Sequence, residues 1–163
     1  MKVGVFFYSW TGHTKEVAGI IADHYIAELN EIKEKVDRKG RLDFFRGIFQ
    51  AFFGSNVDII MPSNKPEDYD MVFLGTPVWA GRQVPAIKTF VEKTNWADKP
   101  TFIFLCQSAN SQKYMNTVSL FMEGHQANVI GSLYINDKCS KEEIKERVLE
   151  KISKLKINKK EEE

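Results

Sequence analysis

The sequence predicts an α/β fold in which an open five-stranded parallel sheet carries helices on both faces. Short apolar runs rich in β-branched and aromatic residues alternate along the chain with segments whose apolar residues recur at helical spacing. These runs are nearly continuous in apolar residues, as in parallel strands that are buried on both faces. The length of 163 residues is that of one domain, so we expect residues 1–163 to form a single domain.

The first element is expected to be a strand at Val3–Tyr8, because this apolar run is too short for a helix. We expect it to be the central strand of the sheet. Apolar residues at helical spacing predict a helix over Lys15–Leu29, and the alternating charges of Ile32–Val36 predict an edge strand. The loop 9–14 therefore joins the carboxyl end of a strand to the amino end of a helix.

Residues 41–55 form the segment least expected in a minimal alternating domain. Its phenylalanines and aliphatic residues follow i, i+3, i+4 spacing, and Gly54 ends the pattern, which predicts an apolar helical insertion. We interpret this insertion as a crossover helix that covers one face of the sheet. The alternative is that some of its phenylalanines overhang a ligand site or form a subunit contact.

The rest of the chain continues the alternation. Three further apolar runs are expected to be strands: Met71–Gly75, Thr101–Leu105 and Asn128–Ile135. Helical spacing predicts helices around Ile87–Val91 and Tyr114–Met122, and a last helix begins at a capping box formed by Ser140 and Glu143. Residues 158–163 are expected to be a charged tail.

Composition excludes several classes of protein. Lys and Arg number 23 against 22 Asp and Glu, so the formal net charge of +1 gives no basic field for nucleic acid. No apolar run approaches the about 20 residues of a membrane span, and no separate apolar leader precedes the first strand. Cys106 and Cys139 have neither CxxC nor metal-ligand spacing and are expected to be free thiols. We therefore expect a cytoplasmic protein without a metal site.

The loop after the first strand is expected to bind a phosphate. Ser9, Thr11 and Thr14 supply hydroxyls, and the free backbone N–H groups and positive end of the following helix point into the same space. A nucleoside triphosphatase loop would end in Gly-Lys-Ser or Gly-Lys-Thr, whereas Gly12 is followed by His13. A dinucleotide fingerprint needs three glycines. The pattern favours a phosphate monoester, and the alternative is a Ser/Thr-rich turn that only caps the helix.

Two other loops are expected at the same edge of the sheet. They are residues 76–82, after the third strand, and residues 106–111, after the fourth. In open α/β sheets, ligands bind outside the carboxyl ends of the strands, where the strand order reverses. The three loops are therefore expected to meet around one ligand.

The motifs carry a resemblance to a known family. The loop 9–14, Ser-Trp-Thr-Gly-His-Thr, resembles the phosphate loop of flavodoxins, and residues 69–82 resemble the strand and flavin loop of the flavodoxin-like family. The match in order and spacing covers nearly the whole chain. The loop 106–111 departs from the pattern, because many flavodoxins carry a Gly-Asp pair there, followed by a tyrosine. The resemblance implies the strand order 2-1-3-4-5 and one noncovalently bound FMN.

The resemblance also implies which residues bind the cofactor. The expected FMN-binding residues are Ser9, Trp10, Thr11, Gly12, His13, Thr14, Thr76, Pro77, Val78, Trp79, Ala80, Gly81, Cys106, Gln107 and Ser108. Trp79 is expected to stack on the isoalloxazine, because a tryptophan followed by Ala-Gly in a loop is poorly placed for the core; the alternative is a core tryptophan. Trp10 is expected to cover the ribityl chain or the other face of the ring.

Backbone groups are expected to make the remaining contacts with the flavin. The backbone of residues 106–108 is expected at the pyrimidine edge. By analogy with flavodoxins, the peptide of Ala80 and Gly81 is expected to turn over toward flavin N5, which Gly81 permits without a Cβ clash.

The function implied by the resemblance is one-electron transfer between redox partner proteins, with no catalytic residue supplied by the protein. Flavodoxin carriers are usually strongly acidic, whereas this chain is near neutral. One alternative is an FMN-dependent reductase that takes hydride from NAD(P)H and reduces a quinone or a similar acceptor. A second alternative is a flavodoxin-shaped binding module that holds no FMN.

Two other chemistries are excluded by the residues themselves. Receiver domains need an acidic cluster after the first strand and an aspartate at the position of Gly75-Thr76, and this chain has neither. Phosphatases of the Cys-x5-Arg type need an arginine six residues after a cysteine, and neither Cys106 nor Cys139 has one.

Overall fold

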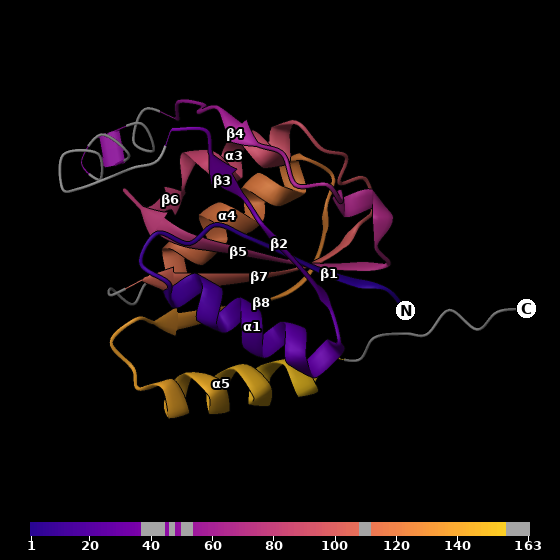
Figure 1. The fold of residues 1–163 in the computed structure, drawn as a ribbon, viewed down its shortest axis with the longest axis vertical. Helices are drawn as coiled ribbons and strands as arrows, with labels where there is room; N and C mark the ends of the chain where they lie inside the picture. Colours follow the sequence, from indigo (N-terminus) through magenta and orange to yellow (C-terminus); the bar gives the residue numbers. More distant parts are fainter. Residues whose placement is uncertain (37–44, 46–47, 50–53, 108–111, 156–163) are drawn as a thin grey trace, which may run out of the picture.

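The computed structural model describes residues 1–36, 45, 48–49, 54–107 and 112–155, and it has the α/β fold expected from the sequence (Figure 1). The parallel strands are β1 (Val3–Phe7), β2 (Glu28–Glu31), β5 (Met71–Trp79), β7 (Pro100–Gln107) and β8 (Asn128–Asn136). They lie in the order β2-β1-β5-β7-β8. Counted along the chain, this is the order 2-1-3-4-5. The predicted fold class and strand order are confirmed.

Helices cover both faces of the sheet. The four described helices are α1 (His13–Tyr25), α3 (Pro85–Glu92), α4 (Gln112–Gly124) and α5 (Lys141–Ser153), and a short 3-10 helix spans Pro66–Asp68. Figure 1 shows α1 and α5 side by side on one face, with α3 and α4 on the other. α5 begins at the predicted capping box, in which Ser140 Oγ accepts from the Glu143 N–H at 3.2 Å and Glu143 Oε2 accepts from the Ser140 N–H at 2.8 Å.

The core consists of two apolar clusters separated by the sheet. Val5 and Phe7 point into the cluster under α1 and α5, whereas Phe6 and Tyr8 point into the cluster under α3 and α4. This alternation follows from the two-residue period of a strand. Every residue of β1 is buried, and β1 pairs with β2 on one side and β5 on the other. Burial on both faces explains why its sequence is continuously apolar.

The first helix is shorter than predicted, and the second strand comes earlier. The sequence predicts a helix to Leu29, but α1 ends at Tyr25 because Ile26 adopts a left-handed conformation with φ 53°. The edge strand is β2 at Glu28–Glu31, so the prediction of this strand at Ile32–Val36 is wrong. Asn30 is the buried side chain of β2, and the strand therefore has no apolar run to mark it.

The segment after β2 forms a structure that the sequence did not indicate. β3 (Lys33–Glu34) pairs antiparallel with β4 (Ile59–Ile60) in a separate two-stranded sheet. The predicted insertion 41–55 and the predicted tail 158–163 lie outside the described residues, apart from Phe45, residues 48–49 and 54–55. Ile48 packs against the core cluster under α3 and α4. Among the described residues, no helix has the length and apolar character needed to cross a membrane.

Two of the expected ligand loops are partly strands. The sequence predicts that the strand after Met71 ends at Gly75, but β5 continues to Trp79 and pairs with β6 (Arg82–Gln83) as an antiparallel hairpin. β7 likewise continues to Gln107. The sequence hides the extension of β5 because Pro77 removes one donor from the β5 ladder and is typical of a strand end. Part of the expected ligand site is therefore formed by the ends of β5 and β7 and not by loops alone.

Candidate functional site

The loop between β1 and α1 forms a cradle around the amino end of the helix. Ser9 Oγ accepts hydrogen bonds from the N–H groups of Gly12 at 3.1 Å and Lys15 at 3.2 Å. Gly12 is the N-cap of α1 with φ 97°, a conformation that glycine adopts without a steric penalty. A Cβ on Gly12 would meet no heavy atom of the described residues within 4 Å. The space over the helix terminus is therefore open to a ligand.

The cradle presents backbone hydrogen-bond donors that no described residue accepts from. The backbone N–H groups of Thr11, His13 and Thr14 have no acceptor among the described residues. They lie at the end of a 13-residue helix, where the helix dipole adds positive potential. Unpaired N–H groups and a helix amino terminus together form an anion site. The phosphate contact expected of this loop stays a prediction, and these donors are arranged as it requires.

A crevice with a volume of about 180 Å³ opens beside this cradle. This volume is that of several water molecules, at about 30 Å³ each in the liquid. The crevice is lined by Trp10, Thr11, His13, Thr14, Pro77, Val78, Trp79, Cys106, Gln107 and Asp137. These residues come from the ends of β1, β5, β7 and β8. The structure therefore brings together three of the segments expected to meet and adds a fourth.

Some expected site residues shape the surroundings of the crevice instead. The Thr76 hydroxyl is buried, donates to the Pro77 carbonyl at 2.7 Å and accepts from the Val84 N–H at 3.3 Å, so it holds the start of the hairpin. Ala80 and Gly81 form the two-residue turn of the hairpin, with φ 49° and 78°. Positive φ at both positions is typical of a type I′ turn. Ser108 lies outside the described residues.

The two indoles of the crevice differ sharply in exposure. Trp79 is 6% exposed and belongs to the core cluster, whereas Trp10 is 37% exposed. The Trp79 ring meets Tyr8 at 5.9 Å and Trp10 at 6.3 Å, both edge to face. The expectation that Trp79 is poorly placed for the core is wrong, because the extension of β5 carries its ring into the core. Trp10 presents the more accessible indole face.

The ends of β7 and β8 form the opposite wall. The pKa of the Cys106 thiol is raised to about 12, mainly because the thiol is buried. A hydrogen bond with Thr14 lowers this pKa in part. The Gln107 carbonyl accepts from the Tyr134 hydroxyl at 3.1 Å and from the Asp137 N–H at 3.3 Å. This carbonyl thus accepts one hydrogen bond from β8 and one from the residue that follows it. The pyrimidine contact expected from the backbone of residues 106–108 stays a prediction.

Asp137 is the lining residue that the sequence reasoning missed. It follows β8 directly, at the same carboxyl edge of the sheet as the other lining segments. Its position immediately after the last parallel strand was the signal that could have identified it. The other strand ends carry hydroxyls, glycines or tryptophans that indicate a ligand site, whereas Asp137 begins an ordinary polar turn.

Fold and crevice together define a class: a doubly wound α/β protein with an anion cradle after its central strand and an aromatic wall beside it. The family model of flavodoxin matches residues 2–152. The chain belongs to the flavodoxin family, and the resemblance seen in its motifs is confirmed. A comparison with curated proteins found no match.

Solved structures share this fold over most of their length. A flavoprotein from Lactobacillus acidophilus NCFM in complex with FMN is 25% identical, with a TM-score of 0.69, over 82% of this chain and 92% of that chain. A putative flavoprotein from Bacteroides eggerthii DSM 20697 is 21% identical, with a TM-score of 0.75, over 93% and 98%. A WrbA-like flavodoxin from Agrobacterium tumefaciens is 16% identical, with a TM-score of 0.57, over 91% of each chain. The last two likenesses establish the fold alone.

Proposed function

We propose that this chain binds FMN noncovalently in the crevice and acts in the cytoplasm as a one-electron carrier between redox partner proteins. The observation that carries the proposal is the cradle, whose N–H groups at Thr11, His13 and Thr14 have no acceptor among the described residues. Membership of the flavodoxin family supports FMN as the ligand. The flavoprotein from Lactobacillus acidophilus NCFM, whose structure contains FMN, supports it as well.

The residues present suit the two ends of FMN. A phosphate monoester has terminal oxygens that accept from N–H groups and hydroxyls, and charge-assisted hydrogen bonds of this kind are the strong ones. The open space over Gly12 leaves room for the phosphate. The flat flavin ring suits the accessible indole of Trp10, which the edge of Trp79 supports from the core. We assign the phosphate to the cradle and the ring to Trp10.

The bound flavin supplies the redox chemistry, and the protein binds, orients and shields it. Trp10, Trp79 and Val78 line the crevice with apolar surface that excludes water from part of the ligand. Cys106 adds no thiolate to the site, because burial raises the pKa of its thiol to about 12. We therefore assign positioning roles to the lining residues and a catalytic role to none of them.

The choice of a carrier over an enzyme rests on exposure. Trp10 lies at the crevice and is 37% exposed, so a ring stacked on it keeps an edge that a partner protein can approach. The alternative function is an FMN-dependent reductase that uses NAD(P)H and a quinone. The second alternative is a binding module without FMN.

One purified sample distinguishes the three functions. Titration with FMN, followed by quenching of flavin fluorescence, should give a stoichiometry of one FMN per chain. Reduction of the complex by dithionite should proceed in two separate one-electron steps, and NAD(P)H should be oxidised no faster than by free FMN. Accelerated NAD(P)H oxidation would select the reductase. Absence of FMN binding would overturn the proposal and favour the binding module.

A further inference from the structure

The two outer strands of the sheet differ in how they are protected against pairing with a second strand. The strand order places β2 at one edge and β8 at the other (Figure 1), and no described strand pairs with the outer side of β8. An unprotected edge presents a row of unpaired N–H and C=O groups that a second strand can bind. Proteins prevent this pairing with short strands, charged side chains, prolines and bulges. These features can be compared at the two edges.

β2 has the protection that is typical of an edge strand. It spans four residues and has a glutamate at each end, Glu28 and Glu31. Glu28 lies 3.8 Å from the Lys2 ammonium group, and Glu31 lies 3.6 Å from that of Lys15. Two copies of this strand paired antiparallel would bring their glutamates together, and like charges that face each other across a ladder are destabilising. β2 is therefore protected by its length and by its charge.

β8 has little of this protection. It spans nine residues, Asn128–Asn136, and none of them is charged or a proline. A bulge at Ile130 interrupts the pairing with β7, but residues 131–136 follow it in unbroken register. Ile135 is the only residue of β8 that is fully buried, whereas every residue of β7 after Pro100 is buried. β8 is therefore a long, uncharged and partly exposed edge.

The backbone of β8 has hydrogen-bonding groups left for a second strand. Its inner side forms a parallel ladder with β7, and one ladder engages only the groups that point to that side of a strand. In the described part of the chain, the backbone groups of Val129–Ile135 make no hydrogen bond outside this ladder. The outer side of β8 can therefore form a second ladder.

We propose that two copies of this chain form a dimer in which β8 pairs antiparallel with β8 of the second copy. A two-fold axis lets the same edge serve both copies, so the contact closes after two chains. The second copy suits this edge because both strands are uncharged, whereas a charged peptide of another protein would meet no opposite charge along it. Since β2 is protected, the sheet cannot grow further from its other edge, and the product is a dimer and not a filament.

The dimer leaves the candidate site accessible. Asp137, which follows β8 directly, lines the crevice, so the crevice lies at the carboxyl end of this strand. In an antiparallel pair the carboxyl ends of the two strands point in opposite directions. The two crevices therefore lie at opposite ends of the contact. The inference goes beyond the proposed function and does not depend on it.

Ser132→Lys and Ser132→Glu test this contact. Ser132 is half-buried within the unbroken stretch of β8, opposite Ile103 of β7, and charges of one sign in both copies repel across a ladder. Ile26→Lys is the control, because Ile26 is 95% exposed at the end of α1, next to the opposite edge strand β2. Sedimentation velocity measures the mass at chain concentrations up to about 1 mM, where weak association is detected.

We expect the wild type and Ile26→Lys to form the same dimer, which dissociates on dilution. Each Ser132 variant by itself should raise the dissociation constant of the dimer about fivefold or more, because one like-charge contact is introduced. An equimolar mixture of Ser132→Lys and Ser132→Glu should restore the dimer, since opposite charges then face each other. Thermal unfolding of each variant checks that its fold is intact.

Four results would overturn the inference. A wild type that stays monomeric at about 1 mM would leave the edge to solvent or to an extended segment of another protein. A mass larger than two chains would show that the contact does not close. Equal dimerisation of wild type and both Ser132 variants would place the contact elsewhere, as would a mixture of folded variants that stays monomeric. Absence of FMN binding would overturn the proposed function alone, because the dimer is measured without FMN.

Discussion

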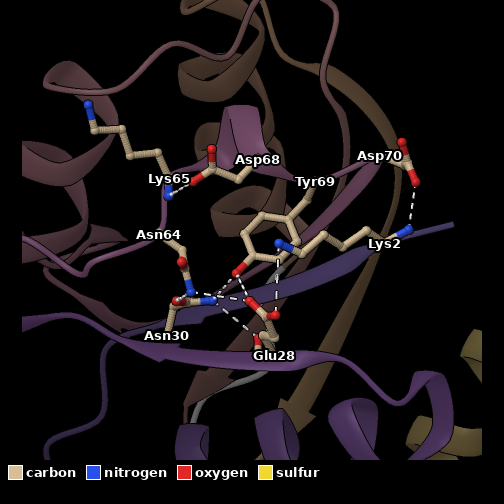
Figure 2. A network of polar contacts seen from close by, with 8 residues as sticks. All are labelled: Lys2, Glu28, Asn30, Asn64, Lys65, Asp68, Tyr69 and Asp70. Atoms are coloured by element: carbon tan, nitrogen blue, oxygen red, sulfur yellow. Dashed lines mark hydrogen bonds and ion pairs between the residues drawn. The ribbon is translucent and has the colours of Figure 1, made fainter.

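The amino and carboxyl ends of the sheet differ in how their polar groups are hydrogen-bonded. At the amino end, polar side chains pair with one another: the Tyr69 hydroxyl donates to Glu28 Oε2 at 2.6 Å and accepts from Asn30 Nδ2 at 3.1 Å (Figure 2). Asn64 closes the group with hydrogen bonds of 3.2 Å to both Glu28 and Asn30. Lys2 lies 4.8 Å from the centre of the Tyr69 ring. At the carboxyl end, the N–H groups of Thr11, His13 and Thr14 in the cradle have no acceptor among the described residues.

Gly4 and Gly12 show the same difference between the amino and carboxyl ends of the sheet. A Cβ on Gly4, at the amino end of β1, would lie 2.7 Å from the Tyr69 ring, whereas a Cβ on Gly12 would meet no described residue within 4 Å. Gly4 is required because the Tyr69 ring fills the space in which a Cβ would lie. Gly12 is favoured because its φ is positive. The amino end therefore satisfies its polar groups locally, whereas the carboxyl end leaves backbone N–H groups without an acceptor among the described residues. Variants at the two ends should separate unfolding from FMN affinity.

The largest effect is expected for the two indoles. Trp79→Ala should lower the free energy of unfolding by about 3–5 kcal/mol, because it empties a space in the core cluster. Trp10→Ala should leave stability within about 1 kcal/mol and weaken FMN about tenfold through the loss of ring contact. Urea unfolding and fluorescence titration measure the two quantities. A destabilised Trp10→Ala with normal affinity would contradict the assignment of the ring to Trp10.

Gly12→Val is the next test and concerns binding. A β-branched residue at φ 97° is strained, and its side chain occupies the space assigned to the phosphate. We expect FMN affinity to fall about 100-fold, or about 2.7 kcal/mol. Gly19→Ala is the control on the same helix, where a Cβ also meets no part of the described structure within 4 Å. It should retain FMN affinity and gain up to about 1 kcal/mol of stability from helix propensity.

Tyr69→Phe removes the centre of the amino-end network. Loss of the hydroxyl leaves Glu28 and Asn30 without a partner that each now uses, which should cost about 1–3 kcal/mol. FMN affinity should not change, because Tyr69 precedes β5 at the far edge of the sheet from the cradle. Tyr134→Phe is the matched change at the carboxyl end and should cost less, since it removes the hydrogen bond to the Gln107 carbonyl, whereas Tyr69→Phe removes the bonds to both Glu28 and Asn30. Equal costs would remove the distinction between the two ends.

The smallest and most gradual effect is expected from pH. Burial and the hydrogen bond to Glu28 raise the pKa of Tyr69 from 10.0 to about 12. Between these values the unfolded chain has lost this proton while the folded chain retains it, so the free energy of unfolding should fall as the pH rises through the window. Tyr69→Phe should flatten this slope in urea titrations. If the slope is unchanged in Tyr69→Phe, the pH dependence of stability comes from Tyr25 and Tyr134. Burial raises the pKa of both of these tyrosines as well.

The sequence predicts a strand most directly where both faces of the strand are buried, because only apolar residues suit such positions. β1 is apolar at every position because both of its faces are covered, and its prediction required no knowledge of the rest of the chain. The edge strand β2 has water on one side and carries Glu, Leu, Asn and Glu, so it was placed four residues too late, in the segment that forms β3. Pairing with β1 defines this strand, and pairing is a tertiary contact.

The candidate site divides in the same way. The sequence by itself determined the cradle, because hydroxyls and a glycine between a strand and a helix specify local hydrogen bonds and a positive φ. Only the tertiary structure decided which indole is exposed and that Asp137 joins the crevice. Burial of Trp79 depends on its contact with Tyr8, and Asp137 reaches the site through the pairing of β8 with β7. Local conformation follows from neighbours in sequence, whereas exposure and proximity follow from which strands pack together.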